Sequence, residues 1–168
     1  MRKRVLICLF VSSLLAVNLI SGQQSLAYVL NSFNNAEVPY ISVDSLAQNK
    51  KAFYLLDARE QVEYNVSHLK EAVHVGYDNF EVKTVSEMIP DKESPIVVYC
   101  SIGVRSHKIA QKIKKMGYTQ VFNLYGGIFE WKNQGQPVVD NTGIDTEKVH
   151  AYSKIWGIYL KKGEKVYD

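Results

Sequence analysis

Short apolar runs alternate with amphipathic stretches along most of the chain, and this alternation predicts the fold class. Five runs rich in β-branched and aromatic residues each predict a strand, at 39–43, 52–57, 72–75, 95–100 and 120–126. Between and after them, the pattern predicts helices or helical turns over 44–50, 60–66, 79–88, 106–117 and 127–134. Because the runs at 52–57 and 95–100 are apolar on both faces, we expect an α/β fold with a central parallel sheet and helices on both faces.

The beginning of the chain departs from this alternation. Residues 1–22 combine a basic start with an apolar run and small residues at its end, which is typical of a cleavable signal peptide. Cleavage after Gly22 and cleavage after Ala27 both fit the pattern. We therefore expect an exported protein, periplasmic or secreted, in which residues 23–38 form an N-terminal helix and linker.

At the end of the chain, the sequence pattern predicts a C-terminal helical extension over residues 141–168. Within it, 144–162 has the pattern of an amphipathic helix, with apolar residues at helical spacing at Val149, Tyr152, Trp156 and Tyr159 or Leu160. Such a helix covers the domain in one interpretation and binds a partner in the other.

Loss of the signal segment would change both the charge and the cysteine content of the protein. Residues 1–22 hold three of the 20 basic residues and none of the 17 acidic ones, so the remainder is close to neutral. This balance gives no indication of a nucleic-acid partner, and no membrane contact is expected after cleavage. Because Cys8 lies in the signal segment, Cys100 would be the only cysteine left, with no second one for an internal disulfide.

Cys100 lies where a strand is expected to end and a helix to begin. The unpaired N–H groups and the positive dipole end at a helix start favour a thiolate over a thiol. Arg105 adds a permanent positive charge, and Gly103 allows the loop to curl so that successive N–H groups point inward. The sequence therefore predicts a reactive cysteine, with a buried structural cysteine as the alternative.

Three sequence blocks, in the expected order, resemble the rhodanese superfamily. Its active-site loop, in the form C-x-x-G-x-R-S, is matched by CSIGVRS (100–106). Its D-x-R-x-x-x-E-[FY]-x-x-G-H-I-x-G-A signature is similar to LLDAREQVEYNVSHLKEAVHV (55–75), and its closing N-L-x-G-G-I-x-x-W motif to NLYGGIFEWKNQGQPVV (123–139). The resemblance implies a single rhodanese domain over residues 39–140.

The resemblance also implies sulfurtransferase activity with thiosulfate or a persulfide as donor, and without a cofactor or metal. Cys100 would be the catalytic nucleophile, taking one sulfur atom from a small anionic or thiol donor as a persulfide. Cyanide, a small thiol or a protein thiol would then accept that sulfur. The persulfide would be held by the backbone amides of the loop residues Ser101, Ile102, Gly103, Val104 and Arg105. A non-catalytic rhodanese-like interaction module and a thiol or sulfide-handling redox protein are the alternatives.

Several matched positions outside the loop have supporting roles by similarity. Asp57 and Arg59 would lie beside the loop, either as an internal ion pair or as substrate contacts. Glu63, His68 and Trp131 are interpreted as structural. Neither His68 nor His107 is needed as a base by a thiol that is already ionised.

The length and composition of the loop refine the implied chemistry. Six residues run from Cys100 to Arg105, whereas seven run between the corresponding residues in the phosphatase and arsenate-reductase branches of the superfamily. The shorter loop favours a single sulfur atom over a tetrahedral oxyanion. Ser101 and Ile102 are neutral where thiosulfate-specialised members carry basic residues, so a persulfide donor also fits.

Three other positions depart from the family pattern without affecting the implied activity. Ser67 and Glu71 stand where the signature has glycine, and His74 occupies a position that is often asparagine.

Overall fold

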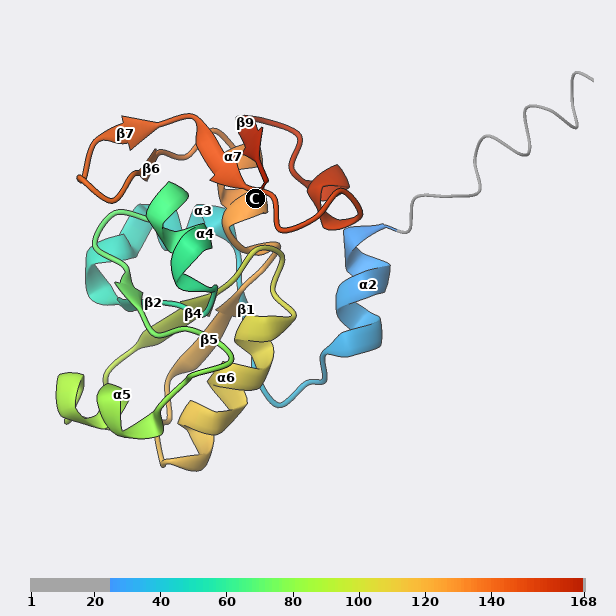
Figure 1. Cartoon of the computed structure of the whole chain (residues 1–168). Coiled ribbons are helices and arrows are strands. Elements are labelled where there is room, and N and C mark those ends of the chain that lie inside the picture. The colour runs from blue at the N-terminus through green and yellow to red at the C-terminus, as the bar shows by residue number, and fades with distance from the viewer. Residues whose placement is uncertain (1–24, 168) are drawn as a thin grey trace, which may run out of the picture.

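The computed structural model describes residues 25–167, and its centre is a five-stranded sheet (Figure 1). The strands are β1 (Tyr40–Ile41), β2 (Tyr54–Asp57), β3 (Val73–His74), β4 (Ile96–Tyr99) and β5 (Val121–Leu124). Their order across the sheet is β1-β5-β4-β2-β3, and every neighbouring pair is parallel. The expected central parallel sheet is confirmed, whereas the signal peptide predicted over 1–22 lies outside the described residues.

Helices cover both faces of this sheet, and the side chains of β4 alternate between them. Val97 and Tyr99 belong to the core on one face, and Ile96 and Val98 to the core on the other. The first face is covered by α2 (Leu26–Phe33), α3 (Val43–Asn49) and α7 (Gly127–Asn133), with a 3₁₀ turn η1 (Lys50–Ala52) after α3. The second face is covered by α5 (Val82–Met88) and α6 (Arg105–Lys115). Among residues 25–167, no helix is both long and apolar enough to cross a membrane.

The carboxyl ends of β2 and β4 meet at one edge of the sheet. The two strands pair in register up to Asp57 and Tyr99, and the Ala58 N–H then donates to the Tyr99 carbonyl at 2.8 Å. Cys100 follows β4 at this edge, and α4 (Gln61–Val66) begins shortly after β2. Loops at such an edge are where parallel sheets commonly bind ligands, because the strands hold their starting points rigidly.

Two positions at which the related family has glycine differ in their backbone conformation. Glu71 has φ 73, a left-handed conformation that costs a residue with a side chain about 1–2 kcal/mol. Ser67 has φ −169, which is ordinary extended backbone. Only the replacement of glycine at Glu71 therefore introduces strain.

The helix expected over 144–162 is not formed, so that prediction is wrong. The chain there forms two short strands, β7 (Asp145–Thr146) and β8 (Lys148–His150), and a 3₁₀ turn η2 (Trp156–Tyr159). β7 pairs antiparallel with β6 (Val138–Val139), and β8 pairs parallel with β9 (Glu164–Val166).

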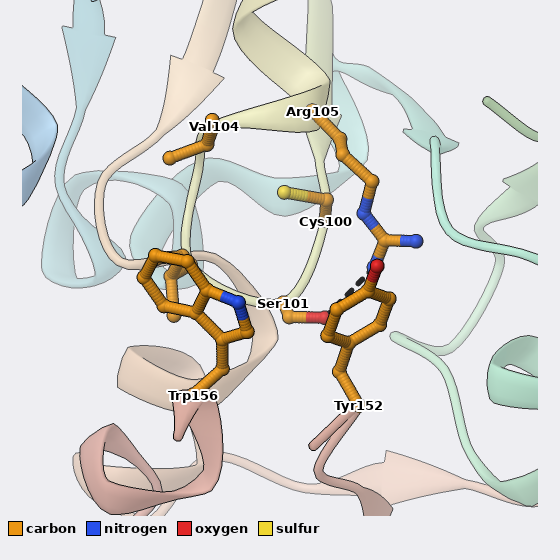
Figure 2. Close-up of a pocket in the computed structure, with 7 residues that line it drawn as sticks. Cys100, Ser101, Val104, Arg105, Tyr152 and Trp156 are labelled. Carbon is orange, nitrogen blue, oxygen red and sulfur yellow. Dashed lines mark hydrogen bonds between the residues drawn. The ribbon is translucent and has the colours of Figure 1, made fainter. Parts of the chain in front are cut away.

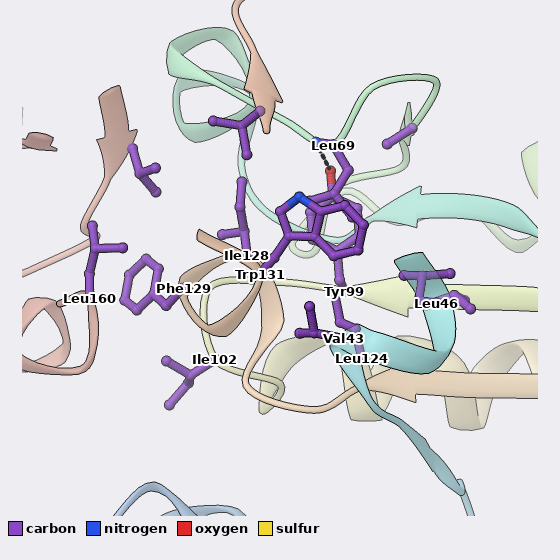
Figure 3. Close-up of a cluster of buried hydrophobic side chains, with 14 of the residues drawn as sticks. Val43, Leu46, Leu69, Tyr99, Ile102, Leu124, Ile128, Phe129, Trp131 and Leu160 are labelled. Atoms are coloured by element: carbon purple, nitrogen blue, oxygen red, sulfur yellow. Dashed lines mark hydrogen bonds between the residues drawn. The ribbon is translucent and has the colours of Figure 1, made fainter. Parts of the chain in front are cut away.

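Pairing of the chain with itself overrides the helical spacing in this extension. β9 returns alongside β8, so the backbone groups of 148–150 are paired in a ladder rather than within a helix. Tyr152 then adopts φ 63, which no right-handed helix contains. Val149 and Leu160 still reach the core, and Figure 3 shows Leu160 beside Phe129 of α7. The extension thus packs against the domain, as one of the two interpretations expected, but not as a helix.

Candidate active site

Cys100 is the first residue after β4, and only 1% of its surface is exposed. Its Sγ accepts a hydrogen bond from the Gly103 N–H at 3.2 Å, and the Ser106 hydroxyl oxygen lies 3.4 Å from it. Gly103 has φ 110, a conformation that residues with a side chain rarely adopt, and this allows its N–H to reach the sulfur. Because α6 begins at Arg105, the unpaired N–H groups of its first turn also lie at the end of this loop. The sulfur is therefore placed among hydrogen-bond donors.

Polar side chains from neighbouring elements fix the loop in its curled shape. Asn123 of β5 donates to the Gly103 carbonyl at 2.8 Å and accepts from the Ser106 hydroxyl at 2.7 Å. Asn34, which follows α2, donates to the same carbonyl at 3.0 Å. With its carbonyl held by two donors, Gly103 cannot relax without breaking both hydrogen bonds.

The start of α7 holds the first part of the loop. The Ile128 N–H donates to the Cys100 carbonyl at 2.9 Å, and the Phe129 N–H donates to the Ser101 carbonyl at 3.1 Å. Gly127 packs so tightly here that an added Cβ would lie 2.7 Å from the Ser101 carbonyl oxygen and closer still to that of Cys100. The second glycine of the G-G motif therefore permits α7 to approach the cysteine loop.

Arg105 is joined to Glu63 of α4 by a bidentate ion pair. Its two terminal nitrogens each lie 2.7 Å from a different carboxylate oxygen of Glu63. Ser101 Oγ lies 3.0 Å from Arg105 Nη2 and 3.1 Å from Glu63 Oε1, which ties the start of the loop to its end. A capping box with Glu60 fixes Glu63 at the first turn of α4. Arg105 thus closes the loop, and its charge is balanced within the protein.

The ion pair also sets the ionisation of the carboxylate. Burial disfavours the charged form of Glu63, but the positive charges of Arg105 and Arg59 outweigh burial and hold its pKa below the ordinary value. Burial likewise opposes the charge of Arg105, and its bonds to Glu63 and its proximity to Cys100 raise its pKa above the ordinary value. Both groups are therefore charged at neutral pH.

We expect removal of the Glu63 carboxylate to lower the free energy of unfolding by an amount that depends on pH. Because folding lowers the pKa of Glu63, its ionised form contributes its full stabilisation above the ordinary value of 4.5. That contribution is lost as the pH falls from 4.5 through the pKa of Glu63 in the folded protein, which is lower. Glu63→Gln should lower the free energy of unfolding by about 1–3 kcal/mol near neutral pH and by less below about pH 4, as measured by urea unfolding.

Glu87→Gln is the matched control for this measurement, because Glu87 is 66% exposed in an ion pair with Lys83 on the surface of α5. Its effect should stay within about 0.5 kcal/mol at every pH. If the Glu63→Gln effect kept its full size in acid, the ionised carboxylate would not be what stabilises the loop.

Asp57 and Arg59 form a second and deeper ion pair. Both side chains are fully buried, with Arg59 Nη2 at 2.7 Å from Asp57 Oδ2 and Nε at 3.0 Å from Oδ1. Arg59 Nη2 also donates to the Ser67 carbonyl at 2.6 Å, and the guanidinium lies 5.8 Å from the centre of the Tyr99 ring. Neither Asp57 nor Arg59 lines the cavity at Cys100. Of the two interpretations of these residues, the geometry favours the internal ion pair over a substrate contact.

A cavity of about 180 Å³ lies in front of Cys100 (Figure 2). The loop contributes Cys100, Ser101, Ile102, Val104 and Arg105 to its lining. The remainder comes from Tyr152 and Trp156 of the C-terminal extension, and Figure 2 shows their rings on either side of the gap before the cysteine. Gly103 does not line the cavity, but it supplies the N–H that is bonded to the sulfur.

Three histidines near the site make contacts elsewhere. His68 stacks on Tyr64 with ring centres 3.8 Å apart, and His74 Nε2 lies 2.8 Å from the Arg59 carbonyl oxygen. His107 on α6 contacts Asn35 through Nε2 at 3.0 Å, and burial lowers its pKa, which favours the neutral ring. None of these three histidines lines the cavity.

Some functional residues could not be identified before the structure was known. Asn123 gives a weak signal, because it is a polar residue in an apolar strand, and its role as an anchor of the loop was not predicted. Glu63 was interpreted as structural, and no local pattern names Arg105 as its partner. Tyr152 and Trp156 have helical spacing in the sequence, so their convergence on the cavity was hidden by the wrong expectation of a helix.

Comparisons with known proteins agree with the sequence motifs. The family model described as "Rhodanese-like domain" matches residues 42–134. The thiosulfate sulfurtransferase GlpE of Coxiella burnetii is 34% identical over 83 residues, which cover 49% of this chain and 75% of that protein. The tRNA uridine(34) hydroxylase of Sodalis glossinidius is 32% identical over 117 residues, which cover 63% of this chain and 33% of the hydroxylase. Some of the curated relatives are therefore much longer than the part that this chain matches.

The fold has counterparts among solved structures. The rhodanese-like domain of an Anabaena protein, solved by NMR, superimposes with a TM-score of 0.56 and 24% sequence identity. The match covers 61% of this chain and 79% of the Anabaena chain. At this identity the likeness concerns the fold alone.

Proposed function

The chain belongs to the family of rhodanese-like domains, and on this premise we propose that it is a sulfurtransferase that carries sulfur on Cys100. The observation that carries the proposal is the position of Cys100 Sγ at a cavity, with the Gly103 N–H bonded to it and a six-residue loop closed by Arg105. This arrangement suits a nucleophilic sulfur that gains a second sulfur atom and then loses it again.

The proposed reaction has two steps of ping-pong type. In the first, the Cys100 thiolate attacks the terminal sulfur of a sulfane donor. The bond between that sulfur and the rest of the donor breaks, its electron pair leaves with the donor, and a persulfide remains on Cys100. With thiosulfate the released product is sulfite, and with an alkyl persulfide it is a thiolate. In the second step a thiol or cyanide attacks the outer sulfur, and the Cys100 thiolate is restored.

The loop supplies the electrostatic part of this reaction. A persulfide carries negative charge on its outer sulfur, which the Gly103 N–H and the first turn of α6 can stabilise through donors that are already in place. Glu63 holds Arg105 at the end of the loop, so the loop need not reorganise when sulfur arrives. No histidine base enters the scheme, because the attacking group is a thiolate.

Mass spectrometry of the intact protein tests the proposal. We would use the full-length chain with Cys8→Ser, in which Cys100 is the only cysteine. Incubation with thiosulfate or with an alkyl persulfide should add one sulfur atom, and cyanide should remove it. The Cys100→Ser variant in the same background should gain no sulfur, since the attacking atom is absent.

The opposite outcome points to the two alternatives. A folded protein that gains no sulfur from any of these donors would not be a sulfurtransferase, and its rhodanese-like domain would then serve to bind a partner. A protein that forms a mixed disulfide with an added low-molecular-weight disulfide, releasing one thiol, but forms no persulfide would instead be a redox protein. It would need an external reductant, because the Cys8→Ser protein has no second cysteine to resolve the mixed disulfide.

A further inference from the structure

One wall of the cavity is built by residues outside the matched family domain. The match ends at residue 134, whereas Tyr152 and Trp156 belong to the extension that follows. Their rings lie on opposite sides of the gap in front of Cys100 and Ser101 (Figure 2). The matched domain therefore supplies the reactive loop, and the extension supplies the surface that an incoming molecule meets.

Tyr152 lies at the cavity with its backbone in an unfavourable conformation. Its φ of 63 is rarely adopted by a bulky residue, since the left-handed conformation brings the side chain close to the backbone. The β8–β9 pairing maintains it, with the Ala151 N–H donating to the Val166 carbonyl at 2.8 Å and the Tyr152 N–H to His150 Nδ1 at 3.1 Å. The ring lies over the guanidinium of Arg105, whose Cζ is 4.8 Å from its centre.

Trp156 forms the facing side of the gap. It begins the turn η2 and packs against the core cluster that contains Phe129 and Leu160. The Tyr159 ring, 6.3 Å away between centres, supports it from the same turn. Trp156 is thus positioned by packing within the extension, and Tyr152 by the β8–β9 pairing and its contact with Arg105, so that the two rings form one wall of the cavity.

The charge of the cavity does not suit a small inorganic dianion. Of the described residues that line it, only Arg105 carries a positive charge, and both of its terminal nitrogens are already bonded to Glu63. Ile102 and Val104 add apolar surface beside the cysteine. A dianion that enters such a site loses hydration without gaining a free cation, whereas an apolar organic group gains free energy by burial.

We infer that Tyr152 and Trp156 determine donor specificity by holding a flat, apolar organic group of the sulfur donor between their rings. This inference rests on the sulfur transfer proposed above and names its substrate class. The donors are organic compounds of the type R–S–SH or R–SO₂–S⁻, in which R is an aromatic or similarly flat group. Inorganic thiosulfate, which has no such group, is the poorer donor.

Two thiosulfonates that differ only in R provide suitable probes. The Cys100 thiolate attacks the terminal sulfur of benzenethiosulfonate, the S–S bond breaks, and its electron pair leaves with benzenesulfinate. Cys100 keeps the transferred sulfur as a persulfide anion, so charge and atoms balance without an oxidant, a reductant or a proton. Methanethiosulfonate reacts in the same way and releases methanesulfinate, but its methyl group cannot fill the space between two rings.

The experiment measures how fast each probe loads sulfur onto Cys100, using mass spectrometry of the full-length chain with Cys8→Ser. The quantity of interest is the rate constant for the phenyl probe divided by that for the methyl probe. Comparing this ratio between proteins cancels the intrinsic reactivity of the probes. Trp156→Ala and Tyr152→Ala should each lower the ratio about three- to tenfold, as expected for the loss of one aromatic contact.

Two further variants serve as controls. Trp156→Phe keeps an aromatic ring and should retain most of the ratio. Ile155→Ala removes a neighbouring side chain that is 73% exposed and does not line the cavity, and its ratio should stay within about twofold of the parent protein. Should Trp156→Ala fail to fold in thermal melting, Trp156→Leu fills the core without a flat ring and is expected to lower the ratio in the same way.

The possible outcomes separate this inference from the proposed function. If both probes load sulfur and the ratio is the same in the parent protein and in every folded variant, the specificity role is overturned while sulfur transfer stands. If none of the donors loads sulfur onto Cys100, including both thiosulfonates, thiosulfate and an alkyl persulfide, the proposed sulfur transfer is overturned. The inference on donor specificity is then overturned as well.

Discussion

A Gly127→Ala variant is expected to lose about 2–5 kcal/mol of unfolding free energy and to load sulfur about a hundredfold more slowly. The stability loss combines the cost of φ 55 for a residue with a side chain and the overlap of its Cβ with the carbonyl groups of Cys100 and Ser101. To relieve the overlap, α7 must withdraw from the loop and weaken the hydrogen bonds from Ile128 and Phe129. A displacement of about 1 Å at the sulfur is enough for the rate effect.

Gly135→Ala is the matched control for this variant. Gly135 also has a positive φ, of 81, but an added Cβ there would meet nothing within 4 Å. It should therefore show the backbone cost alone, about 1–2 kcal/mol in urea unfolding, and load sulfur at the normal rate. Equal losses of stability and rate in the two variants would mean that close packing of α7 on the loop is unimportant.

An Asp57→Ala variant is expected to lower the free energy of unfolding by about 3–5 kcal/mol, measured by urea unfolding at neutral pH. The change leaves the Arg59 guanidinium fully buried without its carboxylate partner, and an uncompensated buried charge is among the most costly defects in a protein interior. In an Asp57→Ala, Arg59→Met double variant no buried charge remains, so much of the loss should be recovered.

Two measurements complete the test of this ion pair. Lys83→Ala breaks the exposed pair with Glu87, and its effect should be no more than about 0.5 kcal/mol. Under conditions in which the double variant is folded, it should still load sulfur onto Cys100, because the pair does not line the cavity. A folded double variant that cannot be loaded would restore the other interpretation, in which Asp57 and Arg59 contact the substrate.

The fold of the central domain was predictable because its signals are local. The continuous apolar runs of β2 and β4 reflect contacts on both faces of each strand, and each run is visible within a few residues. The position of Cys100 between strand and helix follows from the same local patterns. The order of the strands across the sheet was not predicted, since β1 pairs with β5 from far along the chain and no local pattern encodes that pairing.

The rest depends on contacts that no local pattern encodes. The spacing of Val149 and Trp156 fits a helix as well as it fits the observed strand and turn, and the return of β9 decides between them. Glu63 and Arg105 are 42 residues apart, so their pairing follows from the way α4 and α6 meet at the sheet edge. The positions of Tyr152 and Trp156 at the cavity could not be predicted for the same reason, because they depend on the tertiary arrangement of the extension.

The pairing of β1 with β5 and the late position of the extension have a consequence for the order in which the protein matures during synthesis. Tyr40 opposes Asn123, so the first strand must wait for more than half of the domain to leave the ribosome before it finds its neighbour. Asn123 and α7, which shape the cysteine loop, emerge after the cysteine itself, and the aromatic wall emerges last. A nascent chain therefore exposes Cys100 to any oxidant or electrophile around it until Tyr152, Trp156 and the strand β9 have emerged.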